Sequence, residues 1–354
     1  MGFWQQLLRS LAPELEVLPP PTLPSADPVA ERVAQLIRQG MEQARIGRLP
    51  QALEDFQQAI ALDPRQAIGY YNRGCIHYDL ENLEAALEDF NQAIRLDPNL
   101  AVAYANRGLV WMDLGEWESA RLDLNQAITL NNTITRCYIN RALVHLELGD
   151  PRSALADFDR TIAMAPSFFP AYINRGLTRQ QLGDLQGSLA DFDRAVQLDP
   201  TAANAYHYRG RVRGELGDYR GAVADLDHCL QRDPANARAY VDRGVAKSFL
   251  GRYEEAFADL QQALEHNPLL AEAYFNRAQI CLEIGDWQAA VRDLTVVLRL
   301  QPSADAYYSR GMARQKLGDW EGSIADLDQA ARLRLEIAQA PPKHQTDINP
   351  WGSR

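Results

Sequence analysis

The chain has 354 residues and a formal net charge of −11, from 36 lysines and arginines against 47 aspartates and glutamates. This acidic balance argues against a broad surface for nucleic acid or anionic membranes, because such surfaces carry a basic excess. The four cysteines are far apart and include no CxxC pair. We therefore expect reduced thiols in small apolar sites, which fits a cytoplasmic protein.

The two ends of the chain differ in pattern from the rest. Residues 1–12, MGFWQQLLRSLA, place their apolar side chains on one face of a short amphipathic helix. The prolines that follow remove backbone donors and forbid a helix over 13–28, so the range 13–32 is predicted to be a proline-rich linker and lead-in. At the other end, 338–354 is predicted to be an extension of the last helix followed by a flexible tail.

Between these ends the sequence repeats with a period of 34 residues. A tyrosine recurs at that spacing, with the last copy one residue early, at Tyr70, Tyr104, Tyr138, Tyr172, Tyr206, Tyr240, Tyr274 and Tyr307. A strict period of this length predicts an array of identical supersecondary units, each packed on its neighbours. We place nine units at 33–66, 67–100, 101–134, 135–168, 169–202, 203–236, 237–270, 271–303 and 304–337.

Each unit is predicted to be two antiparallel helices. In the unit 67–100, apolar residues follow a helical period in two stretches separated by a short loop. The loop usually carries a glycine, which takes the left-handed conformation that ends a helix, although Glu81 stands there in this unit. A proline such as Pro98 stops the second helix. Small residues such as Gly108 and Ala120 recur at one position of each helix, where we expect the backbones to approach closely.

These positions resemble the tetratricopeptide repeat, in the style common in bacteria and cyanobacteria. The chain has Tyr, Gly or Ala, Ala, Phe or Leu, Ala and Pro in the family order and spacing over 33–337. The resemblance implies an all-α fold, a right-handed α-solenoid superhelix of nine helix-turn-helix units. It also implies that the first helix of each unit lines a concave face, toward which its second, fifth, sixth, ninth, twelfth and thirteenth positions point.

At these inward positions the resemblance places a partner-binding groove. The candidate residues are Tyr71, Asn72, Cys75, Tyr78, Asp79, Asn106, Leu109, Met112, Asp113, Ile139, Asn140, Leu143, Glu147, Ile173, Asn174, Leu177, His207, Tyr208, Arg211, Arg238 and Asp242. The residues expected to form an exposed apolar stripe, which usually marks a partner site, are Tyr71, Tyr78, Met112 and Ile173. Acidic residues such as Asp79 and Glu147 lie beside the stripe and favour a basic, amphipathic partner. Around His207 the groove becomes polar, which indicates two sub-sites.

Asparagine recurs at the sixth position, at Asn72, Asn106, Asn140, Asn174 and Asn276. Its side chain offers both a donor and an acceptor, which suits the backbone of an extended peptide. The same side chain could instead bond the scaffold's own loops. The sequence leaves both alternatives open.

Arginine and aspartate recur in step in the first and second helices, as at Arg73 and Asp89. We expect a ladder of ion pairs, because the planar guanidinium can grip a carboxylate with two bonds. In the first unit Gln39 replaces the arginine, so either Asp55 is unpaired or the pairing runs from one unit to the next. The sequence does not choose between these.

No motif for chemistry emerges from the sequence. The six histidines show no metal-ligand spacing, and there is no P-loop and no GxSxG. We therefore expect no enzyme, no metal and no cofactor, but a scaffold or assembly factor that binds a protein partner, as a peptide or a helix, in its groove.

Two other functions stay open, although neither membrane contact nor nucleic acid is favoured. One is a membrane-associated adaptor anchored peripherally by 1–12, where Arg9 is the single basic residue. The other is an RNA-binding solenoid that uses Arg209, Arg211, Arg213 and Arg238.

Overall fold

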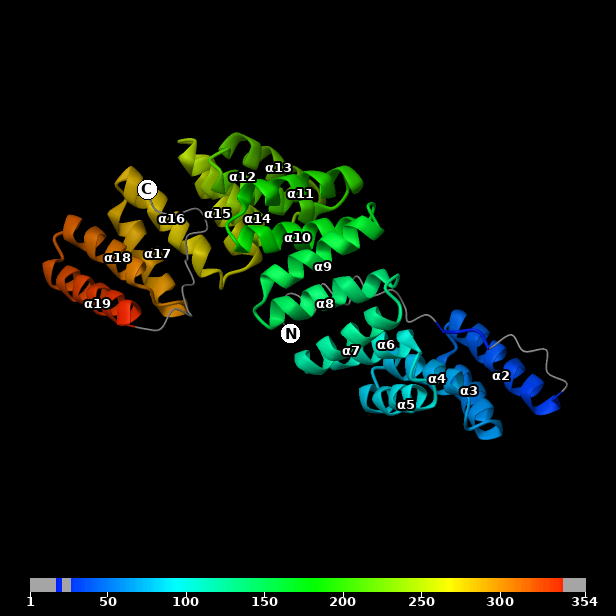
Figure 1. The fold of residues 1–354 in the computed structure, drawn as a ribbon. Helices are drawn as coiled ribbons and strands as arrows, with labels where there is room; N and C mark the ends of the chain where they lie inside the picture. The colour runs from blue at the N-terminus through cyan, green and yellow to red at the C-terminus, as the bar shows by residue number, and fades with distance from the viewer. Residues whose placement is uncertain (1–16, 21–26, 340–354) are drawn as a thin grey trace. The chain divides into compact units, whose positions relative to one another are not determined.

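The computed structural model describes residues 17–20 and 27–339 of the chain. All regular secondary structure in these ranges is helical (Figure 1). The helices are α2 (Pro28–Arg45), α3 (Leu49–Leu62), α4 (Ala67–Asp79), α5 (Leu83–Leu96), α6 (Ala101–Asp113), α7 (Trp117–Leu130), α8 (Thr135–Glu147), α9 (Pro151–Met164), α10 (Phe169–Gln181), α11 (Leu185–Leu198), α12 (Ala203–Glu215), α13 (Tyr219–Arg232), α14 (Ala237–Phe249), α15 (Tyr253–His266), α16 (Ala271–Ile284), α17 (Trp287–Leu300), α18 (Ala304–Lys316) and α19 (Trp320–Gln339). The helix predicted at 1–12 lies outside the described residues.

The helices are packed in consecutive pairs. In the first half of the chain α2 packs on α3, α4 on α5, α6 on α7 and α8 on α9, and each pair contacts the next through α3 and α4, α5 and α6, and α7 and α8. The first helices of neighbouring pairs also touch, α2 with α4, α4 with α6 and α6 with α8. The described residues up to Thr178 form one compact unit and those from Arg179 a second, built in the same way. The expected all-α fold of stacked helix pairs, an α-solenoid, is confirmed.

The first helix begins earlier than the repeat pattern indicates. Helix α2 starts at Pro28, whereas we placed the first unit from residue 33. Asp27 caps this start, since its side chain accepts a hydrogen bond from the backbone N–H of Val29 at 2.9 Å. Pro28 fits the first helical position because its nitrogen has no hydrogen to leave unpaired. Residues 28–32 of the predicted lead-in are therefore helical.

The loop without glycine keeps the same backbone shape as the others. Glu81 has a φ of 59°, close to the 77° of Gly115 at the equivalent place in the next unit. Its N–H donates to the carbonyl oxygen of Tyr78 at 2.8 Å, which closes the end of α4. A side chain in this left-handed region costs about 1 kcal/mol, so the packing of α4 against α5 holds Glu81 there against its own preference.

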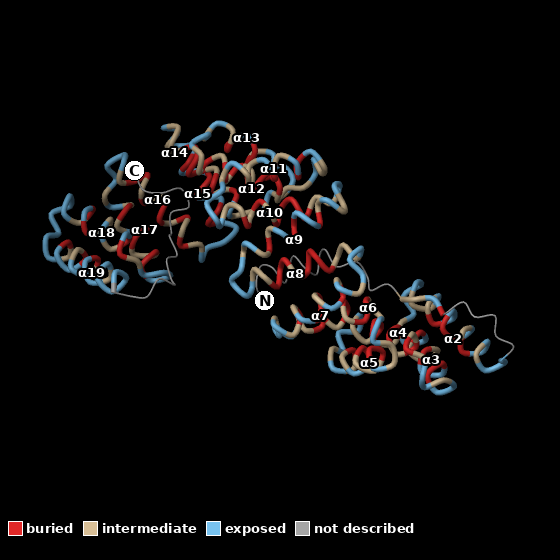
Figure 2. The backbone as a smooth tube through the Cα atoms, viewed as in Figure 1, coloured by how far each residue is buried: buried red, intermediate tan, exposed pale blue. Residues whose placement is uncertain are grey.

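Small residues lie where the two helices of a pair come closest. A Cβ added to Gly40 would lie 2.7 Å from the ring of Phe56, and one added to Gly108 would lie 3.2 Å from Cγ of Leu124. Phe56 and Leu124 are both fully buried. The predicted close approach is confirmed, and Figure 2 shows buried residues recurring along the helices.

The ladder of ion pairs joins the helices within a unit and also links one unit to the next. The Nε and Nη2 atoms of Arg107 donate to the two carboxylate oxygens of Asp123 in its own unit, each at 2.7 Å. Its Nη1 atom donates to Oδ1 of Asn91 in the preceding unit at 2.6 Å. We call this three-bond contact the arginine staple, and it is made by Arg73, Arg107, Arg141, Arg209, Arg243, Arg277 and Arg310.

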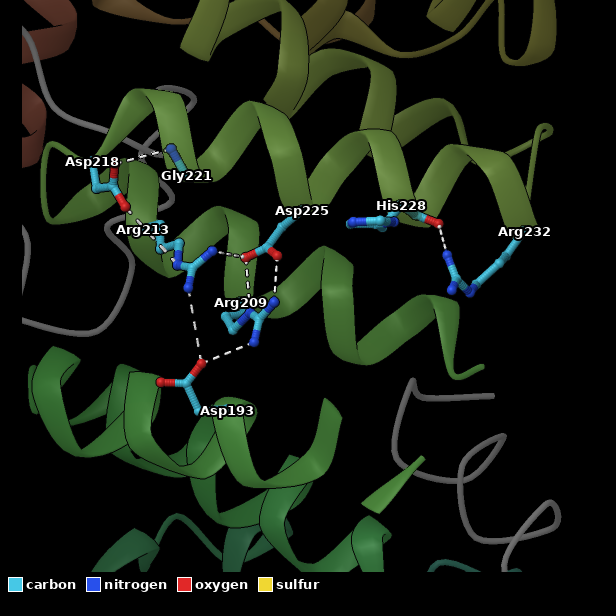
Figure 3. A network of polar contacts seen from close by, with 8 residues as sticks. All are labelled: Asp193, Arg209, Arg213, Asp218, Gly221, Asp225, His228 and Arg232. Atoms are coloured by element: carbon cyan, nitrogen blue, oxygen red, sulfur yellow. Dashed lines mark hydrogen bonds and ion pairs between the residues drawn. The ribbon is translucent and has the colours of Figure 1, made fainter. Parts of the chain in front are cut away.

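Figure 3 shows one staple from close by. Arg209 lies between Asp225 on α13, in its own unit, and Asp193 on α11, in the preceding unit. The ladder pairing therefore lies within a unit, and the third bond reaches a different residue of the preceding unit, as Arg73 bonds Asp89 and Gln57 and not Asp55. In the first unit, where Gln39 replaces the arginine, burial together with the charge of Glu54 raises the pKa of Asp55.

Candidate functional site

Most of the apolar stripe expected in the groove is buried. Tyr71 is 0% exposed, Met112 1% and Ile173 2%, so the expectation that these three side chains are exposed was wrong. For Tyr71 and Met112 the reason is that α4 packs on α6, and α6 on α8. Thus the hydroxyl of Tyr71 accepts a hydrogen bond from Nδ2 of Asn106, one unit further along, at 3.0 Å. Such residues join the units and do not face solvent.

The candidate residues fall into three groups by exposure. The buried ones are Tyr71, Asn72, Cys75, Asn106, Leu109, Met112, Ile139, Asn140, Leu143, Ile173, Asn174, His207 and Asp242. The partly exposed ones are Tyr78, Asp113, Leu177, Tyr208 and Arg211. The exposed ones are Asp79, Glu147 and Arg238. Direct contact with a partner is therefore open chiefly to the polar members of the set.

A short piece of the proline-rich linker lies against the first helices. The backbone N–H of Leu18 donates to Oδ1 of Asn72 at 2.7 Å, and Nδ2 of Asn72 donates to the carbonyl oxygen of Leu18 at 2.9 Å. One amide side chain thus satisfies both backbone groups of a residue 54 positions away. Of the two roles that the sequence left open for asparagine, this is the bond to a segment of the chain itself, and it engages both the N–H and the C=O of one residue.

The side chains of the linker piece complete the contact. Val17 packs against two buried clusters, one around Ile37 and Phe56 and the other around Tyr71. Leu18 packs against the second cluster, and Pro20 is buried. No repeat pattern covers these residues, and the only signal that could have marked them is a pair of apolar residues inside a proline-rich segment. We call residues 17–20 the linker strand and the side chains that it covers, with Asn72 at their centre, the Asn72 surface.

The other asparagines of this row have different surroundings. Nδ2 of Asn276 donates to the carbonyl oxygen of Glu272 in the preceding helical turn at 3.0 Å, which is a local role. Asn174 is fully buried, and neither of its side-chain polar atoms has a hydrogen-bond partner among the described residues. A buried amide without partners is costly, and because Asn174 is 0% exposed its side chain is closed to direct contact with a partner.

The polar part of the candidate set forms its own network. Nε2 of His207 lies 2.8 Å from Oδ2 of Asp242, and the imidazole ring stacks on the ring of Tyr208 at 5.7 Å. Burial, helped by the charge of Asp242, raises the pKa of Glu272 to about 7. These carboxyl groups and rings make the region around His207 more polar than the Asn72 surface.

The arginines considered for RNA are partly neutralised. Arg209 and Arg213 both bond the buried carboxylate of Asp225, and Nε of Arg211 lies 3.5 Å from Oε1 of Glu215. In the part of the chain that the structure describes, no group of three His, Cys, Asp or Glu side chains could hold a metal ion. Over the same residues, no helix combines the length and the apolar character needed to cross a membrane.

The comparisons with known structures agree with the fold. A tetratricopeptide repeat protein from Parabacteroides merdae is 20% identical, and the match covers 71% of this chain and 97% of that one with a TM-score of 0.54. PilF of Pseudomonas aeruginosa is 17% identical over 63% of this chain and 99% of its own, with a TM-score of 0.55. YrrB, described as a TPR protein with an unusual peptide-binding site, is 21% identical over 52% of this chain and 94% of its own, with a TM-score of 0.47.

At these identities the two structures with TM-scores of 0.54 and 0.55 show the fold alone. No curated protein matches the chain in sequence. Models of the tetratricopeptide repeat match residues 67–100, 44–80, 139–203, 203–236, 248–305 and 282–341, which together make up more than half of the chain. With the stacked helix pairs and the small residues at their closest contacts, these matches show that the chain belongs to the tetratricopeptide repeat family.

Proposed function

We propose that the chain is a non-enzymatic scaffold or assembly factor that holds an extended segment of a partner protein against its first helices. One observation supports this most directly, namely the grip of Asn72 on both backbone groups of Leu18. Because these bonds go to the main chain, any extended segment with a free N–H and C=O at one residue can make them. Side-chain contacts around that residue then supply the selectivity.

The exposed charges argue for a basic partner. Asp79 and Glu147 occupy the thirteenth position of their units and are exposed, whereas Asp113 is partly covered and accepts a hydrogen bond from the hydroxyl of Tyr78 at 2.8 Å. A row of carboxylates attracts a segment with lysines or arginines and repels an acidic one. Since the charges are exposed, added salt should weaken the attraction.

Site-specific photocrosslinking tests the proposal. A photoreactive residue replaces Asp79 or Glu147 at the first-helix surface and, as a matched control, the exposed Glu88 on the second helix α5. We expect one partner protein to crosslink from positions 79 and 147 in the native source, with a yield that falls as salt is raised, and not from position 88.

The opposite pattern would contradict the proposal. A partner that crosslinks from position 88 and from neither of the other two would place binding on the second helices. A partner captured equally at all three positions and at every salt concentration would show no dependence on the acidic row.

A further inference from the structure

We propose that the linker strand is the resident ligand of the Asn72 surface, and that a partner binds there by presenting the same chemistry and displacing it. The chemistry is that of Val17-Leu18-Pro19-Pro20, two apolar residues followed by two prolines in an extended backbone. This inference rests on the proposed function and names the kind of segment that the surface accepts.

The hydrogen-bonding groups of the strand match those of the surface. Asn72 provides one acceptor and one donor, and Leu18 uses both. The next two residues, Pro19 and Pro20, have no N–H, so they leave no donor that the surface must satisfy. A proline at the buried position of Pro20 therefore suits this surface, whereas an ordinary residue there would bury a donor without a partner.

The sequence of the strand favours an extended backbone conformation even before it binds. A residue that precedes proline is restricted to extended conformations, which applies to both Leu18 and Pro19. Consecutive prolines favour the polyproline II conformation, so such a segment loses little conformational freedom when it binds. The apolar part of the recognition comes from Val17 and Leu18, which pack on the buried clusters of the first units, and from the buried Pro20.

The linker strand is connected to the scaffold by a short stretch of chain. Only residues 21–27 separate the linker strand from the start of α2 at Pro28. A short linker holds its ligand at an effective concentration on the order of 1 mM. A segment that binds at about 100 µM on its own would thus occupy the surface most of the time, and a competing segment would bind roughly tenfold more weakly than to an open surface.

A direct test uses a labelled peptide with the sequence of residues 17–24, VLPPPTLP, with a capped N-terminus, and the full chain. Fluorescence anisotropy measures its Kd for the unmodified protein and for a Leu18→Pro variant, in which the strand cannot donate to Asn72. The Glu88→Ala variant is the control, because Glu88 is exposed on α5 and lies outside the Asn72 surface. We expect roughly tenfold tighter peptide binding to Leu18→Pro than to the unmodified chain, and an unchanged Kd for Glu88→Ala.

A second pair of variants locates the binding site. Adding Asn72→Ala to Leu18→Pro should abolish the gain, whereas adding Asn276→Ala, at the same position of a later unit, should leave it intact. Circular dichroism of each variant verifies that the helices are retained. A peptide with proline in place of the leucine that corresponds to Leu18 should not bind.

Several outcomes would overturn the inference. Equal Kd values for the unmodified chain and Leu18→Pro would mean that the strand does not compete, and failure of the peptide to bind Leu18→Pro would mean that its chemistry is not the one recognised. A dimer that becomes a monomer on Leu18→Pro substitution would place the strand on a second copy of the chain. If the peptide fails but a partner crosslinks from positions 79 and 147, this inference falls and the proposed function stands.

Discussion

The arginine staple between the second and third units allows a quantitative test of what holds neighbouring units together. We consider the substitution Arg107→Met. It removes two hydrogen bonds to Asp123 and one to Asn91, all between 2.6 and 2.7 Å. Asp123 is only 6% exposed, so its carboxylate remains buried without its cation. Leaving a buried charge unpaired in this way costs roughly 3–5 kcal/mol.

The expected loss is near the lower end of that range, because the side chain of Arg107 itself is 20% exposed and water can partly replace it. A loss of about 3 kcal/mol corresponds to roughly a hundredfold change in an equilibrium constant. Repeat proteins do not unfold in a single step, so the local effect is best measured by native-state hydrogen exchange. Amides of α6 and α7 should exchange roughly a hundredfold faster in the variant, while those of α16 and α17 should be unaffected.

Two further variants show whether the reasoning is correct. In Arg107→Met with Asp123→Leu the buried charge is gone, and most of the lost protection should return. The control Arg252→Ala breaks a pair of the same geometry, with bonds of 2.7 and 2.6 Å to Glu255, but on the surface. It should leave exchange almost unchanged. Equal effects of Arg107→Met and Arg252→Ala would refute the argument that burial makes the staple important.

Three other predictions follow from close packing and burial. Gly108→Leu should lower the melting temperature through overpacking of about 1–3 kcal/mol, since even a Cβ would lie 3.2 Å from Leu124, and an unchanged melt would contradict this placement. Burial raises the pKa of all four thiols to about 11 or 12, in Cys75, Cys137, Cys229 and Cys281. The native protein should therefore react with thiol reagents only when it unfolds, and rapid labelling of the folded protein at neutral pH would disprove this prediction. Because the pKa of Glu272 is raised from 4.5 to about 7 in the folded chain, its contribution to stability is present below pH 4.5 and lost as the pH rises through 7. Glu272→Gln should therefore reduce the fall in melting temperature between about pH 5 and about pH 8, and an identical fall in both proteins would count against it.

The sequence by itself determined the fold to a large extent. The period of the tyrosines, the glycine in the loop and the proline at the junction are local signals, each with a direct backbone consequence. They were enough to predict the helix pairs and the contact of Gly108 with the second helix. Arginine in the first helices and aspartate in the second recur with the same period. This predicted the ladder of ion pairs, because residues that recur in register on packed helices also recur as neighbours in space.

The tertiary structure decided which of these side chains are accessible. A helical period gives the side of the helix on which a residue lies, but not whether another helix covers that side. Tyr71 and Met112 therefore had the pattern of a binding stripe, although the neighbouring first helices bury them. The contact between Leu18 and Asn72 joins residues 54 positions apart, one of them outside every repeat, so no pattern of spacing could have shown it. Only the folded chain brings the linker strand and the Asn72 surface together, because that contact depends on where α4 lies after the first units have packed.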